Sequence, residues 1–333
     1  MRVRLPILCT ALALLLAVAV AGSAEAGPRH GAEWLCLVSK ANPDREHTIR
    51  VPGKVADRLI AHTRSYRGPC AEYGESKPLG EGTQTAYSQT VGDRPVSIGW
   101  RISDSALEGL PYDPPNAGLW CYDKDGDGTT DRMTECTGGY ETALKLGPKF
   151  RDQVDSPFTY VLANWNPMGH MPPHVYDLPH FDVHFYQNEN SERLAIRPGP
   201  CPALVNCEDY ELGKDLPDDR YLPDDYQDLD AVEPAMGNHL IDPTGPEFNG
   251  ERFTHTFIYG TWDDETTFYE PMITYEWLTG LGDGSRASGC HEMKLPQAWQ
   301  QSGWYPTQYC IRHLDNRDET AVSLEGFTYR HAS

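Results

Sequence analysis

Residues 180–186 read His-Phe-Asp-Val-His-Phe-Tyr, with polar and apolar side chains in strict alternation. Successive side chains of a β-strand point to opposite faces of its sheet, so this stretch predicts a strand with one polar and one apolar face. Similar alternating stretches, each ended by turn residues, occur at 96–102, 158–163 and 253–259. The sequence therefore predicts a protein built mainly from β-strands.

Turn-forming residues set the expected architecture. The chain contains 30 glycines and 27 prolines, and long helical periodicity is scarce. We predict an antiparallel β-barrel or a sandwich-like domain, with long loops closed by disulfides and few short helices. The helix candidates are 55–64, 104–110 and 271–281.

Composition divides the chain into four parts. The third part, residues 95–285, includes a loop at 121–136 that resembles a calcium-binding loop, and a strongly acidic insertion at 208–233. We expect the insertion to be a solvated loop between two core strands. The parts are a signal peptide (1–26), an N-terminal segment with a disulfide (27–94), a β-rich domain (95–285) and a C-terminal extension closed by a disulfide (286–333).

The N-terminal segment has the three features of an export signal. Residues 1–4 are basic, residues 5–21 form an apolar run, and Ala24-Glu25-Ala26 is a small-x-small cleavage motif. The apolar run is a little short for a transmembrane helix, and no second run of this kind follows it. We therefore expect cleavage after Ala26, no membrane span in the mature chain, and a secreted protein that is periplasmic or extracellular.

The cysteines agree with export. Cys9 lies in the signal segment, and the other eight form an even set, which in an exported chain predicts disulfides. Eight cysteines allow about 105 complete pairings, so the sequence alone leaves the connectivity open. Short loops close at the lowest entropic cost, which favours pairing between sequential neighbours. These pairs are Cys36–Cys70, Cys121–Cys136, Cys201–Cys207 and Cys290–Cys310.

The acidic composition limits the classes of partner. The formal net charge is −21, a balance that repels nucleic acid and anionic membranes and suits cations. The same charge also serves solubility. We expect a small molecule or an ion as the ligand, and no nucleic acid.

One acidic loop has the spacing of a calcium site. Aspartates at the first, third and fifth positions of a curled loop converge on one cation, a glycine at the sixth position permits the turn, and the seventh residue offers its carbonyl. The predicted ligands are Asp123, Asp125, Asp127, Thr129 and Asp131.

The loop departs from a full EF-hand. Its twelfth position is Thr134 instead of a bidentate glutamate, and Glu135 follows one position late. It therefore resembles the calcium loops of dockerin-like and thrombospondin-type repeats more than an EF-hand. Cys121 and Cys136 bracket it, which predicts a loop closed by a disulfide. A structural calcium ion is the prediction, and an acidic turn without an ion is the alternative.

A second group of ligand-type residues lies around the alternating strand. His180 and His184 stand about 13 Å apart along a flat strand, so one metal would need a bend to reach both. A smaller site, made by Asp182 with one histidine, is the alternative. Imidazole and carboxylate ligands suit Zn, Mn, Fe or Cu. The candidate metal ligands are His170, His180, His184, His239 and Glu270.

The long strings that carry these residues resemble a family of uncharacterised secreted bacterial proteins. The family has a domain of unknown function with the signature N-P-x-G-H, P-H-F-D-x-H-F-Y, M-G-x-H-x-x-D and E-P-M. Here these strings begin at 166, 179, 236 and 270, and the likeness spans about 95–280. The resemblance implies a compact β-rich domain, with a homo-oligomer as one option, and no assigned activity. The calcium-type loop and the acidic insertion depart from the family pattern, which leaves the oligomeric state open.

Two functions follow from these residues. The first is a secreted protein that binds a divalent metal through a histidine and carboxylate cluster. The second is a metal-dependent enzyme, a hydrolase, a lyase or an enzyme of cupin-like oxygen chemistry, with a site made by His180, His184, His239 and Glu270. In the enzyme, Glu270 would be a ligand or the general base, and Asp182 would orient a ligand histidine. The cupin analogy is one of fold alone, because the spacing differs.

Overall fold

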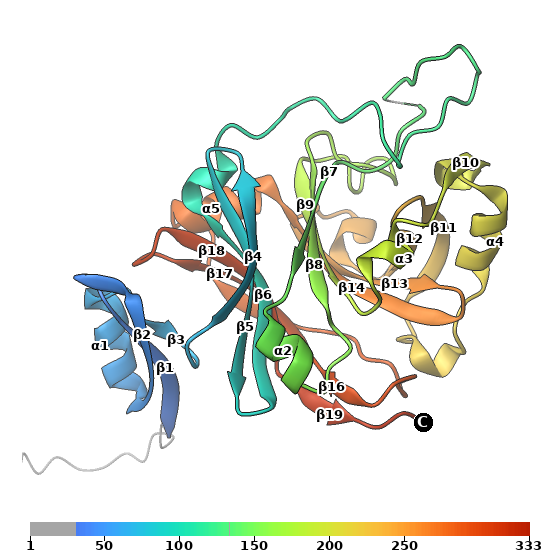
Figure 1. Ribbon diagram of the computed structural model, residues 1–333. Helices are drawn as coiled ribbons and strands as arrows, with labels where there is room; N and C mark the ends of the chain where they lie inside the picture. Colours follow the sequence, from blue (N-terminus) through green and yellow to red (C-terminus); the bar gives the residue numbers. More distant parts are fainter. Residues whose placement is uncertain (1–30, 133) are drawn as a thin grey trace, which may run out of the picture.

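The computed structural model describes residues 31–132 and 134–333, so the predicted signal peptide and its cleavage site lie outside the described residues. Two large antiparallel sheets pack face to face, and a small N-terminal unit lies beside them (Figure 1). Neither large sheet closes on itself, so the sandwich-like form of the predicted β fold is the one adopted. No helix among the described residues is long and apolar enough to span a membrane.

The seven-stranded sheet carries the predicted histidine strand near its middle. Its order is β11-β12-β13-β14-β9-β8-β7, and all its neighbours are antiparallel. The strands are β7 (Tyr140–Lys145), β8 (Tyr160–Asn166), β9 (His180–Tyr186), β11 (Gln227–Glu233), β12 (Gly237–Ile241), β13 (His255–Trp262) and β14 (Glu265–Thr274).

The six-stranded sheet joins strands from distant parts of the chain. Its order is β15-β17-β18-β6-β5-β4, so segments from 27–94, 95–285 and 286–333 pair within one sheet. The strands are β4 (Glu72–Leu79), β5 (Gly82–Val91), β6 (Arg94–Ser103), β15 (Gly289–Glu292), β17 (Gln308–Leu314) and β18 (Glu319–Glu325).

Smaller elements complete the fold. The N-terminal unit has the strand order β2-β1-β3 with one helix, and β16 pairs with β19 near the C-terminus. These elements are β1 (Ala32–Ser39), β2 (Asn42–Pro52), α1 (Gly53–His62), β3 (Tyr66–Arg67), β10 (Pro198–Cys201), β16 (Gly303–Tyr305) and β19 (Thr328–Arg330).

The main core lies between the two large sheets. The apolar face of β9 packs there, as its alternation predicts, and Phe181 meets Trp100 of β6 with ring centroids 5.2 Å apart. Both rings are almost fully buried. The polar face of β9 must consequently point away from this core, and this orientation positions the candidate site.

Three predicted helices form with shifted ends. Residues 55–64 correspond to α1, and 104–110 shorten to a 3-10 turn at Asp104–Leu107. In the 271–281 candidate, helix α5 (Tyr275–Gly282) begins only after Thr274, whose hydroxyl accepts a hydrogen bond from the Trp277 amide and caps the helix. Additional helices and 3-10 turns are α2 (Pro148–Gln153), α3 (Asn190–Arg193), η2 (Pro202–Leu204), η3 (Asp219–Tyr221) and η4 (Pro246–Asn249).

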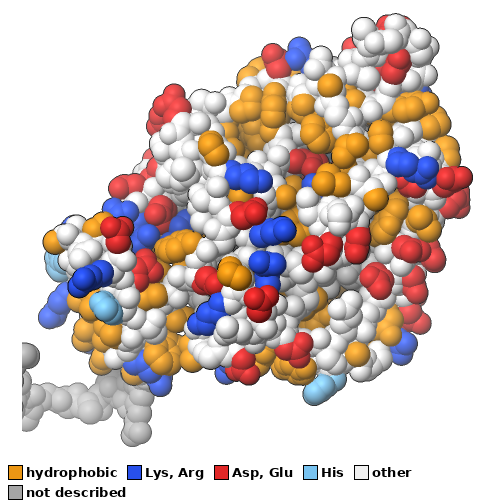
Figure 2. Space-filling view, viewed as in Figure 1, with side chains coloured by type: hydrophobic (Ala, Val, Ile, Leu, Met, Phe, Trp, Pro, Cys, Tyr) orange, Lys and Arg blue, Asp and Glu red, His pale blue; other side chains and the backbone are white. Residues whose placement is uncertain are grey.

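The acidic insertion at 208–233 is not the solvated loop that its composition predicted. It contains most of helix α4 (Cys207–Lys214) and ends in the edge strand β11. Asn206 caps the helix by accepting from the Glu208 amide, and Arg197 binds the buried Asp209 carboxylate. Acidic side chains gather on the side of the molecule where α4 lies (Figure 2). Local capping and pairing thus order a segment whose charge favoured a loop.

All four predicted disulfides form among the described residues, each between sequential neighbours. The Cys290–Cys310 bridge joins residues that lie directly opposite each other on β15 and β17. The Cys36–Cys70 bridge holds the N-terminal unit together.

A pair of partly buried histidines predicts acid sensitivity. The His255 and His291 rings lie 4.1 Å apart, and Nδ1 of His255 lies 2.9 Å from the Tyr309 hydroxyl. Burial lowers the pKa of His255 to about 4, and the neighbouring His291 acts in the same direction. An unfolded histidine takes up its proton near pH 6.5, so folding stability is lost as pH falls from there toward 4.

The free energy of unfolding of the native chain should fall as the pH is lowered from about 7 to about 4.5. In the His255→Phe variant this fall should be smaller by roughly 2 to 3 kcal/mol, because no histidine at this position takes up a proton. Urea denaturation across this pH range measures the difference. His47 is exposed, so His47→Phe serves as the control and should follow the native pH dependence. Parallel pH profiles for His255→Phe and the native chain would contradict the prediction.

Candidate metal centre

The polar face of β9 is buried against a second, smaller core. Tyr176 and Phe253 come from the loops that cover this face of the seven-stranded sheet. His180 and His184 are fully buried, and Asp182 is nearly so. The predicted sharing of one face is therefore confirmed, although the face is enclosed by loops.

Two separate clusters form on this face. We call His170, His180 and Asp182 the rim cluster, and His184, His239 and Glu270 the buried cluster; within each, one ligand atom per residue lies within 4.8 Å of the others. The structure thus does not bring His180 together with the other three residues of the predicted enzyme site. The cause is strand geometry, because β9 runs without a bulge between the two histidines and keeps them about 13 Å apart.

Asp182 is the centre of the rim cluster. Its Oδ1 lies 3.0 Å from Nε2 of His180, and its Oδ2 lies 3.4 Å from Nε2 of His170. Asn166, on the neighbouring strand β8, donates its amide to Oδ2 at 2.5 Å. Nδ1 of His180 lies 2.6 Å from the Leu178 carbonyl, so this ring donates there and turns Nε2 toward the carboxylate.

The rim cluster contains an ion pair between Asp182 and His170. Burial would raise the pKa of Asp182, but the two histidines hold it well below its usual range. Burial would lower the pKa of His170, but the hydrogen bond and charge of Asp182 raise it to about 9. A proton on His170 therefore balances the carboxylate. The His170 side chain is about a quarter exposed, so this cluster reaches the surface.

Strands β9, β14 and β12 supply the buried cluster, and β13 lies between β14 and β12. The register that pairs Met272 with Asp182 and Tyr269 with Phe185 places Glu270 of β14 opposite His184 of β9. His239 of β12 lies opposite Gly260 of β13. These strands hold the three side chains rigidly, as a ligand site requires.

Gly260 makes room for this arrangement. A Cβ atom on Gly260 would lie 2.1 Å from the Phe268 ring, so the missing side chain lets that ring lie across β13. The Phe268 ring then packs against both cluster imidazoles, with its centroid 4.9 Å from the ring of His184 and 5.0 Å from that of His239. The Phe268 ring therefore forms one wall of the buried cluster.

Three polar atoms of the buried cluster lack hydrogen-bond partners. Both ring nitrogens of His184 lack a well-formed hydrogen bond, and so does Oε2 of Glu270. Nε2 of His184 lies 3.4 Å from Oε1 of Glu270, and Nε2 of His239 lies 3.9 Å from Oε2. Ligand atoms about 2 Å from a tetrahedral ion are separated by about 3.3 Å, so the first spacing suits two ligands better than a hydrogen bond.

Charges inside the cluster are costly without a cation. Burial lowers the pKa of His184 to about 3, which keeps its imidazole neutral. Burial raises the pKa of Glu270 well above its usual range, and the carboxylates of Asp182 and Glu233 add to this effect. Neutral imidazoles are the form that binds metals, and a divalent ion would stabilise the ionised Glu270.

His239 has the orientation of a metal ligand. Its Nδ1 lies 3.0 Å from the Ala231 carbonyl and donates to it, which leaves the Nε2 lone pair facing Glu270. Main-chain carbonyls commonly fix metal-binding histidines in this way. Two imidazoles and one carboxylate are a ligand set that suits Zn, Mn or Fe and leaves a coordination position open.

The acidic loop at 121–136 curls as its spacing predicts. Carboxylate oxygens of Asp123, Asp125 and Asp127 lie within 4.8 Å of one another. Oxygens of Asp123 accept from the amides of Gly126 and Gly128. The loop therefore gathers three of its five predicted ligands.

Glu135 was not among the predicted calcium ligands, but it contributes to the structure of this loop. Its buried carboxylate accepts from the backbone amides of Lys124, Asp125 and Asp131, so it folds the loop from within. Thr129 donates its hydroxyl to Asp127. The sequence offered one signal, a glutamate one position after the expected twelfth ligand.

Asn166 was also not predicted as a site residue, although it opens the string that contains His170. Its amide contact with Asp182 depends on the pairing of β8 with β9, which sets Asn166 opposite His180.

His174, in the same string, is almost fully exposed and contacts only Asp177 among the described ion-pair partners, at 3.8 Å.

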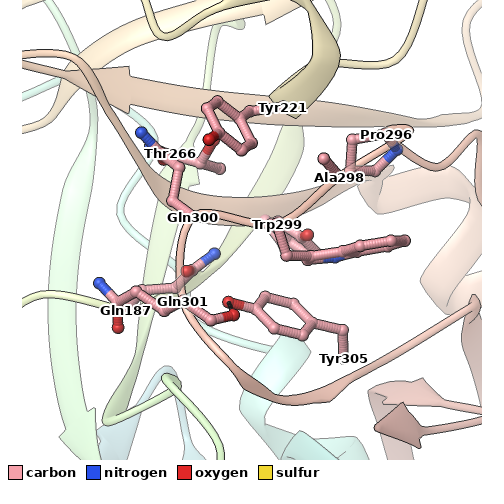
Figure 3. A pocket seen from close by; sticks show the side chains of 10 residues that line it. Gln187, Tyr221, Thr266, Pro296, Ala298, Trp299, Gln300, Gln301 and Tyr305 are labelled. Atoms are coloured by element: carbon pink, nitrogen blue, oxygen red, sulfur yellow. Dashed lines mark hydrogen bonds between the residues drawn. The ribbon is translucent and has the colours of Figure 1, made fainter. Parts of the chain in front are cut away.

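A small polar pocket on the far side of β14 is not a ligand site. Gln187, Trp299, Gln300 and Tyr305 line it, and Figure 3 shows their side chains around it. Its volume is about 20 Å³, which is room for one water molecule. The indole nitrogen of Trp299 and the amide nitrogen of Gln187 have no protein partner there, so a single water would satisfy them.

Comparison with known proteins gives no family for this chain: no protein-family model, no curated protein and no solved structure matches it. The functional argument therefore rests on the geometry of the two clusters and of the acidic loop.

Proposed function

We propose that this chain is an exported protein that binds one divalent transition-metal ion in the buried cluster of His184, His239 and Glu270. The observation that carries the proposal is the set of unpartnered polar atoms of His184 and Glu270 at a fully buried position. Buried polar atoms without partners cost about 1–3 kcal/mol each, and a bound cation would remove that cost.

Binding is favoured over catalysis because the buried cluster is enclosed. His184 and Glu270 are at most 1% exposed, and His239 is 8% exposed. A reacting substrate would have to displace the Phe268 ring or the covering loops. The four disulfides support an oxidising compartment and hence export.

The rim cluster supports a second candidate, a metal-dependent enzyme. Its third residue, His170, is partly exposed, and Met171 beside it is 71% exposed, so a ligand could approach from solvent. In that enzyme Asp182, His170 and His180 would hold the metal. The ion pair already present argues against it, because a metal would have to displace the proton on His170.

Metal content distinguishes these options. The mature chain, purified with intact disulfides, should bind one Zn²⁺ or Mn²⁺ per molecule after removal of adventitious metal. Elemental analysis after dialysis measures this stoichiometry. A content well below one ion per chain for every divalent metal tested would refute the proposed function.

We also propose a structural calcium ion in the acidic loop, supported by the convergent carboxylates of Asp123, Asp125 and Asp127. Calcium at about 2 mM should slow tryptic cleavage after the exposed Lys124 by about tenfold, because the ion would rigidify the loop. Mass spectrometry after reduction measures the cleavage. Asp125→Asn with Asp127→Asn should abolish the protection, whereas Asp263→Asn with Asp264→Asn should retain it. Equal native cleavage rates in calcium and in chelator would count against the ion.

The family resemblance of the strings beginning at 166, 179, 236 and 270 is part of the same proposal. Three of these strings supply five of the six residues of the two clusters, and the fourth supplies the sixth, Glu270. If the resemblance is correct, the metal site would be the shared feature of those proteins.

A further inference from the structure

A cavity of about 860 Å³ lies between the N-terminal unit and the outer face of the six-stranded sheet. Helix α1 and strand β3 form one wall, and β5, β6, β17 and β18 form the floor. Volumes of this size are typical of small-molecule sites. The cavity lies on the other sheet from both histidine clusters, so it is independent of the proposed metal site.

The pairing of the strands places a small residue between two large ones in the cavity floor. Ala321 of β18 lies directly opposite Arg101 of β6 on one side and Arg312 of β17 on the other. Cross-strand partners share a face of the sheet, so two guanidinium side chains flank a position with only a methyl group. All three residues line the cavity.

Arg101 is held in place but keeps an unused donor. Its side chain is 6% exposed, and its Nη1 donates to the Tyr73 hydroxyl at 2.9 Å and lies 3.4 Å from Glu319. Its Nε has no hydrogen-bond partner. An unpaired N–H on a buried cation is costly, and this nitrogen is itself enclosed by protein atoms.

Aromatic rings surround the same guanidinium. The Arg101 Cζ lies 4.7 Å from the ring centroid of Tyr87 and 5.0 Å from that of Tyr66. Both tyrosines are nearly buried and line the cavity, together with Ile60 of α1. The site therefore combines a buried cation with flat apolar walls.

Arg312 closes the other side of the hollow. It pairs with Glu325, and its side chain is about a third exposed. It is thus neutralised and more open to solvent than Arg101. An anion would bind mainly to Arg101, with Arg312 at its outer edge.

We propose that this cavity binds a small organic anion, a carboxylate carried on a planar apolar group. The carboxylate would accept hydrogen bonds from Arg101, and the apolar group would lie against Tyr66 and Tyr87. In a chain with a net charge of −21, an anion site requires such a locally buried cation.

The test compares 2-naphthoate with its uncharged amide, 2-naphthamide, by calorimetric titration of the disulfide-intact mature chain. The naphthoate should bind about tenfold or more tightly than the naphthamide, because a hydrogen bond to a buried cation is lost in the amide. Equal affinities, or no saturable binding of the naphthoate, would overturn the proposal.

A substitution in the cavity floor tests whether naphthoate binds in this cavity or elsewhere on the protein. Ala321→Leu fills the hollow without removing a polar partner and should weaken naphthoate binding by about tenfold or more. Ala195→Leu, at an exposed position outside the cavity, should leave binding unchanged. Unaltered affinity in a folded Ala321→Leu chain would also overturn the proposal. Metal chelation should not affect naphthoate binding, so failure here and failure of the metal site are distinguishable.

Discussion

Replacing Asp182 by alanine is expected to lower the free energy of unfolding by about 3–5 kcal/mol, even without metal. The carboxylate is nearly fully buried and faces His180 at 3.0 Å and His170 at 3.4 Å. Its removal would leave the Asn166 amide and the protonated His170 without their shared acceptor. Breaking a buried pair from one side costs more than the pair contributes in net stability, because the remaining partners stay desolvated.

Urea denaturation of the disulfide-intact protein in chelator measures this loss. Asp177→Ala is the matched control, because Asp177 also faces a histidine, His174, but the two side chains are 49% and 95% exposed. Exposed pairs contribute about 0–1 kcal/mol, so this control should stay close to the native stability. Similar stabilities for the two variants would show that the rim cluster is not a buried ion pair.

Replacing Glu270 by glutamine is expected to weaken Zn²⁺ binding by about a hundredfold or more, equivalent to about 2.7 kcal/mol. Glu270 is the only carboxylate in the buried cluster as defined here, and it lies 3.4 Å from His184 and 3.9 Å from His239. Glutamine keeps the shape of the side chain but removes the charge that offsets the cation. Competition against a chromophoric chelator measures the affinity.

Glu265→Gln is the matched control, because Glu265 lies on the same strand at an exposed position. It should retain native affinity. Metal-free Glu270→Gln should be about as stable as the native chain, because burial already favours the uncharged form of Glu270. Native Zn²⁺ affinity in this variant would exclude the buried cluster as the metal site.

His184→Ala provides a second check on the same site, with His174→Ala as its control. His184 is fully buried, whereas His174 is almost fully exposed. Loss of Zn²⁺ binding only on removal of His184 would assign the site to the buried cluster. Loss on removal of His170, with His184 dispensable, would assign the metal to the rim cluster instead.

The alternation in 180–186 was enough to predict the strand, its two faces and the burial of Phe181. Side-chain direction in a strand is a local property with a period of two, so a single sequence contains it. The disulfide pairing was also predicted correctly, because short loops close at the lowest entropic cost. The acidic insertion was wrongly predicted as a loop, because the cap at Asn206 and the partner Arg197 outweigh its charge.

What the sequence could not determine is which residues meet across strands. His239 and Glu270 reach His184 only because β12, β13, β14 and β9 lie in this order and register. The separation of His180 from that group likewise follows from a strand without a bulge. Spacing along one chain fixes the face on which a side chain lies, whereas the partners on that face depend on pairings between residues far apart in sequence. The sequence by itself therefore determined the polar face and its ligand types, and only the tertiary structure divided that face into two clusters.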